Sequence, residues 1–374
     1  MSRPESLVGY RRAPSLLQRL GLDGPLLAGL LAIMAFGLYV LYSAGGQDSA
    51  LLTRQAARLG VGLVLMTLVA QFHPHRIRLL TPLGYALGLL LLLGVLLFGT
   101  GAKGAQRWLD LPGLPRFQPS ELVKILVPMM VALWISRDRL PVRISGVWWA
   151  LVMVFVPVAM IAKQPDLGTS LLVAASGLFV ILLAGLSWRW IFGAAGLGAI
   201  GLPLLWMNMR EYQKQRVLTF LDPESDPLGA GWNIIQSKTA IGSGGFFGKG
   251  WQAGSQAQLD FLPESHTDFI IAVLAEELGL VGVVLLLSLY LFVIGRCLVL
   301  ASRAGETWGR LLAGALTMTF FVYVFVNIGM VSGILPVVGV PLPLVSYGGT
   351  SAVTLLVSFG LIMATQREKN RVSA

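Results

Sequence analysis

A short polar segment stands immediately before one of the long apolar stretches of this chain. It runs from residue 261 to Asp268 as Phe-Leu-Pro-Glu-Ser-His-Thr-Asp, and the apolar stretch that follows carries Glu276 and Glu277. The simplest interpretation is that Thr267 or Asp268 caps the helix that begins here, an effect of about 1 kcal/mol, but capping is compatible with catalysis. Glu276 and Glu277 lie about two turns deeper, where ionised side chains are costly unless they face a partner or a wet cavity.

Two further sets of charges lie within or beside apolar stretches. Glu121 and Lys124 are spaced i, i+3 at the start of one stretch, so they can pair on one helix face, and each alone would be expensive in a membrane. A structural ion pair is favoured over direct chemistry. Asp166, in the segment Lys-Gln-Pro-Asp-Leu-Gly, precedes another apolar stretch. A helix N-cap is the simpler role for Asp166, and lining an active cavity is the alternative.

The residue types exclude several kinds of site. The chain has one cysteine and three histidines, which cannot form a Cys/His zinc site or a disulfide within the chain. The segment between about 208 and 268 carries five cations whose charge suits an anionic headgroup. Such charges usually form only a solvated face, and both interpretations stay open. The cations are Arg210, Lys214, Arg216, Lys238 and Lys249.

Composition indicates the elements that must hold these residues. Of 374 residues, 55% are hydrophobic and 12% are charged, and the mean hydropathy is +0.75. Lys and Arg exceed Asp and Glu by 28 to 18, but they lie mostly between apolar runs, which indicates a membrane rather than nucleic acid. We predict an all-α integral membrane protein of about ten spans. These lie near 25–44, 59–72, 79–98, 122–135, 146–162, 168–186, 191–207, 269–295, 311–331 and 350–365.

The distribution of Lys and Arg predicts the orientation. Cations concentrate in the N-terminal segment, in alternate short loops and in the tail, so both termini are expected to be cytoplasmic. The first span follows a long polar segment and is expected to remain as an anchor. The predicted organisation is then a cytoplasmic segment, spans 1–7, a long extracytoplasmic loop, spans 8–10 and a cytoplasmic tail. Their bounds are 1–24, 25–207, 208–268, 269–365 and 366–374.

Several motifs together resemble one family of membrane proteins. Phe-Leu-Pro-Glu at 261–264 leads into His-Thr-Asp-Phe-Ile at 266–270 and then Glu-Glu-Leu-Gly at 276–279. Gln-Pro-Ser-Glu at 118–121 is followed by Lys124, and Lys-Gln-Pro-Asp-Leu-Gly spans 163–168. Gly-Val-Pro-Leu-Pro at 339–343 and Ser-Tyr-Gly-Gly-Thr-Ser at 346–351 complete the set. In this order the motifs resemble the SEDS family (shape, elongation, division and sporulation), and its elongation members (RodA) more than its division members (FtsW).

The resemblance implies a peptidoglycan glycosyltransferase that polymerises lipid II at the outer face of the cytoplasmic membrane. It implies that Asp268 is the essential acid, that Glu121 and Lys124 form an ion pair lining a central cavity, and that Asp166 is its neighbouring acid. Because an α-linked donor giving a β-1,4 product requires inversion, one carboxylate acting as general base suffices. The pyrophosphate leaving group needs cations or a divalent metal.

The implied cofactor is therefore Mg²⁺ or Mn²⁺, with Asp268 as its candidate ligand. Arg210, Lys214 and Arg216 are the candidate pyrophosphate contacts. The implied partners are a single-span class B penicillin-binding protein, lipid II and the growing glycan on undecaprenyl pyrophosphate. Two alternatives from other classes remain open: a lipid II flippase, which buried charges and a ten-span bundle also suit, and a non-catalytic scaffold for a transpeptidase.

Overall fold

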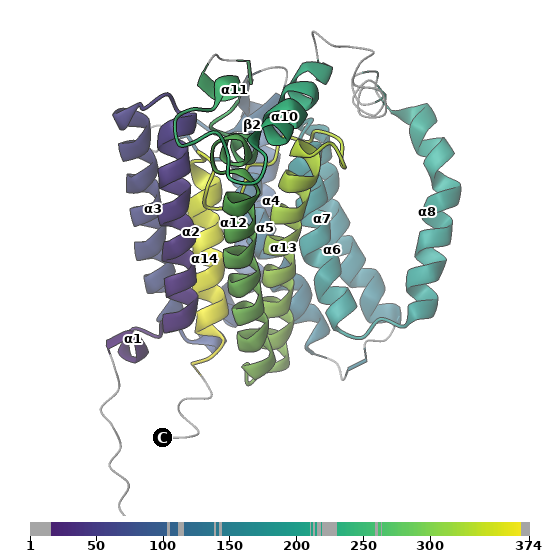
Figure 1. The fold of residues 1–374 in the computed structure, drawn as a ribbon. Coiled ribbons are helices and arrows are strands. Elements are labelled where there is room, and N and C mark those ends of the chain that lie inside the picture. Colours follow the sequence, from purple (N-terminus) through teal and green to yellow (C-terminus); the bar gives the residue numbers. More distant parts are fainter. Residues whose placement is uncertain are drawn as a thin grey trace, which may run out of the picture.

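The computed structural model describes residues 16–102, 105–110, 116–137, 140–141, 144–209, 211, 214, 218, 230–258, 261–262 and 264–367. Most of them form helices (Figure 1). These are α1 (Leu16–Arg19), α2 (Gly24–Ala44), α3 (Ser49–Ala70), α4 (Pro74–Phe98), α5 (Pro119–Ile135), α6 (Ile144–Lys163), α7 (Leu167–Leu183), α8 (Trp188–Asn208), α10 (Ala230–Gly244), α11 (Ser255–Gln258), α12 (Ile270–Arg303), α13 (Thr307–Val331) and α14 (Thr350–Ala364). Strands β1 (Thr100–Ala102) and β2 (Ala105–Trp108) form an antiparallel hairpin after α4.

The apolar stretches of the sequence coincide with helices. Each of the ten predicted stretches lies largely within one of α2 to α8 or α12 to α14. Among the described residues, six helices are long and apolar enough to cross a membrane, and α7 and α14 are shorter apolar helices. The predicted fold class, a helical membrane protein, is confirmed, while the number of spans stays a prediction. Polar residues set several helix starts: the Asp23 carboxylate accepts from the Leu26 amide at 3.0 Å, and that of Asp48 from the Ala50 amide at 2.8 Å.

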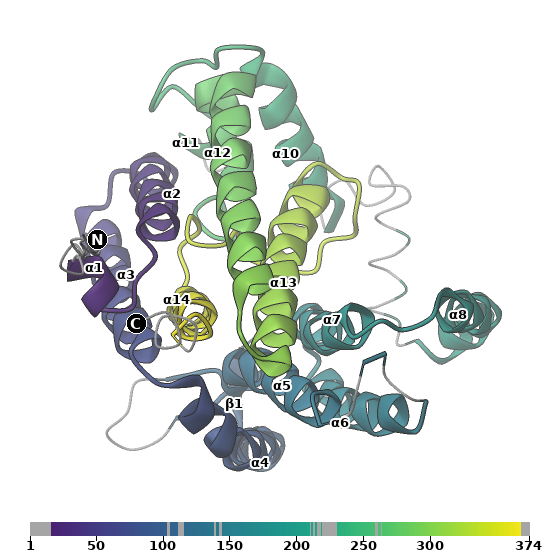
Figure 2. The same cartoon turned by 90° about the horizontal axis from the view of Figure 1, so that it is seen from below.

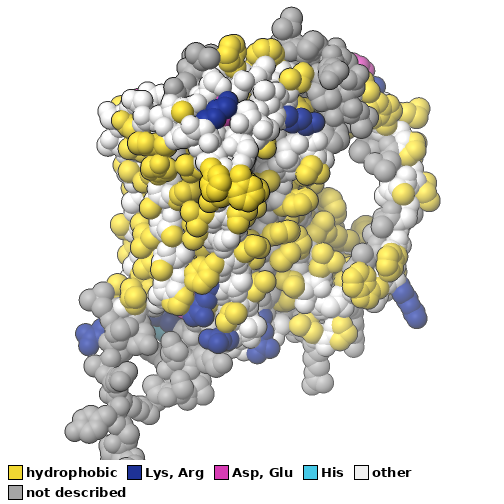
Figure 3. Space-filling view, in the orientation of Figure 1, with side chains coloured by type: hydrophobic (Ala, Val, Ile, Leu, Met, Phe, Trp, Pro, Cys, Tyr) yellow, Lys and Arg dark blue, Asp and Glu magenta, His cyan; other side chains and the backbone are white. Residues whose placement is uncertain are grey.

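The helices pack around α13. In the apolar 18-residue stretch of each helix, 72% of the residues of α13 are buried, against 22% in α3 and in α4. Viewed along the bundle, α14 lies between α3 and α13, and α5 and α7 flank α13 (Figure 2). Helix α8 stands apart from the others in both views, and its apolar side chains are exposed, for example Ile200 and Met207. Hydrophobic side chains cover the middle of the molecule, with Lys and Arg towards its lower and upper edges (Figure 3). This surface suits a lipid environment.

The long helix α12 is broken at Gly279. This residue has φ 64° and ψ −163°, and a Cβ there would clash with the Gly248 backbone nitrogen. The chain after α10 folds against the break, where the Leu280 amide donates to the Gly245 carbonyl at 3.0 Å and the Val281 amide to the Phe246 carbonyl at 3.2 Å. The backbone groups freed by the break are thus satisfied within the protein, as a membrane site requires. The segment predicted as a long loop therefore contains helices, and α10 packs on α12.

Candidate functional site

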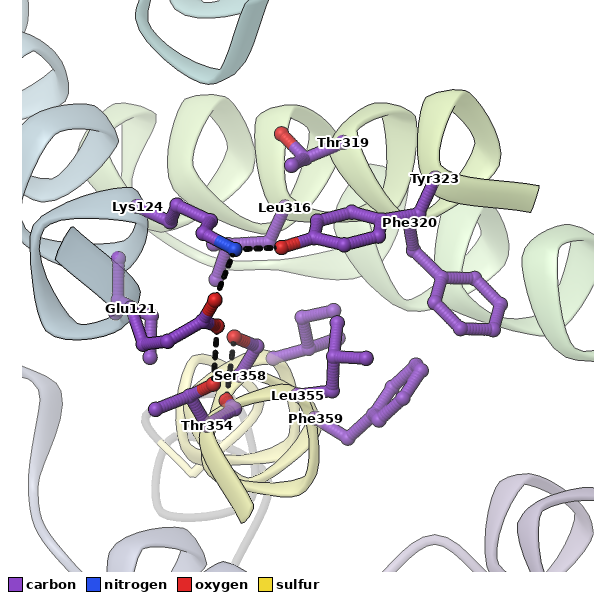
Figure 4. A pocket seen from close by; sticks show the side chains of 12 residues that line it. Glu121, Lys124, Leu316, Thr319, Phe320, Tyr323, Thr354, Leu355, Ser358 and Phe359 are labelled. Carbon is purple, nitrogen blue, oxygen red and sulfur yellow. Dashed lines mark hydrogen bonds and ion pairs between the residues drawn. The ribbon is translucent and has the colours of Figure 1, made fainter. Parts of the chain in front are cut away.

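An ion pair lies in the wall of a cavity between α5, α13 and α14. The Lys124 ammonium is 2.5 Å from a Glu121 carboxylate oxygen, and each residue is only 6% exposed. Lys124 also donates to the Tyr323 hydroxyl, and the Thr354 hydroxyl donates to the other Glu121 oxygen at 3.2 Å (Figure 4). The i, i+3 spacing on α5 thus gives the ion pair that the sequence predicts, and α13 and α14 supply its remaining partners.

The pair borders a large space that we name the central cavity, of about 1030 Å³. Its charged lining consists of four cations and two carboxylates: Arg58, Arg107, Arg116, Lys124, Glu121 and Asp166. Much of the remaining lining comes from two motifs of the sequence, Gly-Val-Pro at 339–341 and Tyr-Gly-Gly-Thr-Ser at 347–351. They lie between α13 and α14 or begin α14. The lining carries a net positive charge, which favours an anionic ligand.

Asp166 both caps a helix and lines the central cavity. As the N-cap of α7 it accepts from the Thr169 amide at 3.3 Å through one oxygen. Its other oxygen accepts from the Gln118 side chain at 2.9 Å and lies 3.6 Å from Nε of Arg107. Arg107 comes from β2, so this contact ties the hairpin to the start of α7. The two roles proposed for Asp166 are therefore compatible in one side chain.

Asp268 lies at the edge of the same cavity. A Cβ placed on Gly339, a cavity-lining residue, would come 3.5 Å from the Asp268 carboxylate. The Asn327 side-chain amide donates to the Asp268 carbonyl at 2.9 Å and to the Val340 carbonyl at 2.7 Å. This fully buried amide holds the turn that carries Asp268 against the loop that lines the cavity.

A second hydrogen bond holds the same turn at His266, two residues before Asp268. The Tyr347 amide donates to the His266 carbonyl at 2.9 Å, and the two rings meet edge to face. The N-cap of α12 is Phe269, which makes no side-chain cap hydrogen bond. The N-cap position predicted for Thr267 or Asp268 is thus occupied by Phe269. The turn is positioned by tertiary contacts with the cavity loop.

Among the cavity cations, Arg58 differs from the other three. Lys124 pairs with Glu121, and Arg107 lies beside Asp166. Arg116 pairs with Asp110 at 3.0 Å. Arg58 has its guanidinium 4.7 Å from the centre of the Tyr347 ring, and within the described part of the chain it forms no ion pair. Among the described residues, Arg58 is therefore the cation of this lining that has no carboxylate partner.

The sequence did not single out Arg58, although a usable indication was present. Helix α3 begins at Ser49, so Arg58 lies nine residues inside the helix. A cation at that depth indicates a functional role. Of the predicted pyrophosphate contacts, Arg210 and Arg216 lie outside the described residues. Lys214 is described; it pairs with Glu211 at 3.1 Å and does not line the central cavity.

The two deeper carboxylates of α12 hold the outer segment in place. Glu276 is fully buried and accepts from the Lys249 ammonium at 2.6 Å and the Ser255 hydroxyl at 3.0 Å. Glu277 accepts from the Ser43 hydroxyl at 2.5 Å. Lys249 is thus committed to a structural pair. Both glutamates have partners, as the cost of buried charge requires.

A family model described as "Cell cycle protein", for FtsW, RodA and SpoVE proteins, matches residues 23–371. The chain belongs to the SEDS family. Among SEDS relatives, peptidoglycan glycosyltransferase MrdB of Escherichia coli K12 is 55% identical over 94% of this chain and 95% of its own. The probable peptidoglycan glycosyltransferase FtsW of Trichlorobacter lovleyi is 37% identical over 91% of this chain and 92% of its own.

Solved SEDS structures show the same fold. One, described as "Structural coordination of polymerization and crosslinking by a peptidoglycan synthase complex", superposes with a TM-score of 0.82 at 34% identity, covering 93% of this chain and 98% of that one. The rod shape determining protein RodA of Thermus thermophilus superposes with a TM-score of 0.70 at 32% identity, covering 92% and 97%. The predicted resemblance to SEDS proteins, and to the RodA type, is confirmed.

The SEDS site residues of the described chain do not by themselves form a metal site. No three His, Cys, Asp or Glu side chains in the described ranges are grouped so that they could hold a metal ion. The carboxylates of Glu121 and Asp166 are engaged by protein donors. Glu121 and Asp166 therefore do not form a metal cage with a third such side chain of the described ranges.

Proposed function

We propose that this chain polymerises lipid II into β-1,4-linked glycan strands at the outer face of the cytoplasmic membrane during cell elongation. Its SEDS membership and its 55% identity to MrdB make it a peptidoglycan glycosyltransferase. The observation that carries the finer proposal is the central cavity, a cationic space between apolar helices with an acid at its edge. Such a cavity suits a sugar donor that carries a pyrophosphate and a lipid tail.

The proposed reaction is a single displacement with Asp268 as the general base. The 4-hydroxyl of the incoming lipid II attacks C1 of the donor sugar, and its proton passes to the Asp268 carboxylate. The bond between C1 and the pyrophosphate oxygen breaks as the new glycosidic bond forms, and undecaprenyl pyrophosphate leaves. A positioned base contributes about 10²- to 10⁴-fold in rate. The backbone clamps from Asn327 and Tyr347 support this role because they limit the movement of the turn that carries Asp268.

The leaving pyrophosphate is proposed to bind the cations of the central cavity. Arg58 is the first candidate because it has no carboxylate partner among the described residues, and a guanidinium matches phosphate oxygens in a bidentate manner. Arg107 and Arg116 lie in the same lining and are already paired, so they contribute charge at the rim. Preorganised cations in a membrane-embedded cavity stabilise the charge that develops on the leaving group.

The buried pair of Glu121 and Lys124 is proposed to act as a positioning element. Lys124 bridges α5 to Tyr323 of α13, and Glu121 bridges α5 to Thr354 of α14, so the pair joins three walls of the cavity. Asp166 has a similar role between α7, the hairpin and Gln118. These contacts fix the shape of the space in which the two sugars meet.

The proposed reaction also includes a divalent cation, Mg²⁺ or Mn²⁺, that binds together with the substrate pyrophosphate. Mg²⁺ is commonly held by one or two carboxylates together with substrate phosphates. Asp268 and the donor pyrophosphate are the groups that could share such an ion, whose chemistry would be to neutralise the leaving phosphates. Polymerisation that stops with EDTA and returns with Mg²⁺ or Mn²⁺ supports this, and full activity in EDTA contradicts it.

The proposed orientation places both termini in the cytoplasm of an inner-membrane protein. The start of α2 and the end of α14 lie at one end of the bundle, because Gly21 stands close to the Arg367 side chain. That end, the lower one in Figure 3, also carries a group of Lys and Arg side chains, as the cytoplasmic side of a membrane protein does. The opposite end carries Asp268. The proposed partner is a class B penicillin-binding protein; support comes from the synthase complex whose description names crosslinking beside polymerisation.

The deciding experiment supplies purified chain with fluorescent lipid II in detergent, with and without the partner transpeptidase. Only a glycosyltransferase makes polymer when there is no membrane to cross, so glycan ladders on a gel are the expected result. A second experiment reconstitutes the chain in vesicles and measures the movement of lipid II between the two leaflets. Movement of lipid II between leaflets, with no polymer in either arm, would contradict the proposal and favour a carrier.

A further inference from the structure

A second, smaller cavity lies at the end of the bundle opposite Asp268. It has a volume of about 350 Å³ and is lined by His75, Arg78, Leu79, Pro82, Leu133 and Arg137. Leu133 lies twelve residues beyond Glu121 on α5, or about 18 Å along the helix. The lining residues come from the start of α4, from α5 and from the turn after α5, and the two helices pack together. It is therefore separate from the reaction site.

The polar half of this cavity is cationic. Arg78 lies 3.3 Å from Glu306, which stands at the start of α13, so its charge is partly compensated. The Arg137 guanidinium lies 5.6 Å from the centre of the Trp134 ring and, in the described ranges, has no ion pair. His75 adds an imidazole ring to the lining. An arginine on an aromatic face keeps its N–H donors available to a further acceptor.

The other half of the cavity is apolar and faces outward. Its apolar lining consists of the buried Leu133 of α5 together with Leu79 and Pro82 of α4. Leu79 is 66% exposed, and the same helix continues with Leu83 at 70%. In a membrane protein such exposed leucines face acyl chains. The cavity thus combines an anion-binding rim with a wall that continues into a lipid-facing surface.

We propose that this cavity binds the phosphate headgroup of an anionic phospholipid, with an acyl chain along α4. Basic pockets between transmembrane helices near a membrane surface bind such headgroups. A free phosphate ion would use the cations but not the apolar wall, so the continuity with Leu79 and Leu83 favours the lipid. With the orientation proposed above, the lipid belongs to the cytoplasmic leaflet. The lipid fastens the α4–α5 end of the bundle at the membrane surface.

The test measures which lipids remain bound to the purified full chain. The protein is reconstituted in nanodiscs with equal phosphatidylglycerol and phosphatidylethanolamine, released, and weighed by native mass spectrometry. Wild type is expected to retain phosphatidylglycerol preferentially. Arg137→Gln is expected to lower that preference about five-fold, since one cation near the surface contributes about that much. Arg137→Lys keeps the charge and is expected to keep most of the preference.

The matched control is Arg303→Gln. Arg303 is an exposed cation at the same end of the molecule, in the last turn of α12, and it does not line the cavity. An equal loss of preference in Arg303→Gln would mean that general surface charge attracts the lipid, and it would overturn the proposal. So would an unchanged preference in Arg137→Gln. Displacement of the lipid by millimolar inorganic phosphate would assign the cavity to free phosphate instead. Unchanged melting temperature in each variant establishes that lost binding does not reflect unfolding.

Discussion

The buried ion pair of α5 gives a sharp prediction about stability. Replacing Glu121 by Gln leaves the Lys124 ammonium buried without its carboxylate, and replacing Lys124 by Met leaves the Glu121 carboxylate with the Thr354 hydroxyl only. Each single variant is expected to be strongly destabilised. The double variant Glu121→Gln with Lys124→Met removes both charges and is expected to be more stable than either single variant.

The geometry of the pair gives the magnitude. The charged atoms are 2.5 Å apart, and both residues are 6% exposed, so water screens the pair poorly. Breaking a buried pair by removing one partner typically costs about 3–5 kcal/mol, whereas replacing both partners by uncharged groups is often nearly neutral. In Glu121→Gln the positive charge of Lys124 is not neutralised by its other partner, because Tyr323 offers only a neutral hydroxyl. The double variant should therefore recover most of the loss.

The assay is the apparent melting temperature of the purified protein in detergent, followed by tryptophan fluorescence for the wild type and the three variants. A double variant as unstable as the sum of both single losses would refute the coupling. Polymerase activity is a separate measurement. A stable but inactive double variant would show that the pair does more than neutralise itself.

Three further outcomes are expected. Arg58→Gln raises the lipid II concentration needed for half-maximal polymerisation about ten-fold or more, while Arg54→Gln, an exposed cation one turn earlier, leaves it unchanged. Gly279→Ala lowers the melting temperature, because a side chain at φ 64° clashes with the facing loop. Burial raises the pKa of Asp23, but hydrogen bonds from Arg296 and a backbone amide outweigh it and lower that pKa. The Asp23 carboxylate therefore stabilises the fold above pH about 4, and the advantage of wild type over Asp23→Asn disappears as pH falls through the lowered value, as melting curves would reveal.

The helical framework could be predicted because lipid imposes a simple rule on sequence. A span needs about 20 apolar residues with its backbone satisfied internally, so apolar runs indicate the helices directly. The ion pair of Glu121 and Lys124 could be predicted as well, because it depends only on the i, i+3 spacing within one helix. The long segment before α12 was predicted only as a loop. Its helix α10 packs on α12 and is held through the break at Gly279, which a sequence alone does not reveal.

The cavity cations could not be predicted for a similar reason. Arg58 lines the central cavity because α3 packs against α14. This packing places the Arg58 guanidinium over the ring of Tyr347, in the loop before α14. Arg107 depends on a short hairpin whose position relative to α7 is a tertiary contact. The sequence instead favoured three cations of the long segment before α12, namely Arg210, Lys214 and Arg216. Of these three cations, Lys214 is described, and it forms a local pair with Glu211.

The most direct test of the account compares Asp268→Asn with wild type in two measurements on purified protein, lipid II binding and glycan polymerisation. Glu211→Gln, which changes an exposed carboxylate of the same outer segment, is the matched control. If Asp268 is the base, the Asn variant binds lipid II as wild type does and polymerises it at least about 100-fold more slowly. Glycan strands formed by the Asn variant at nearly the normal rate would contradict the account.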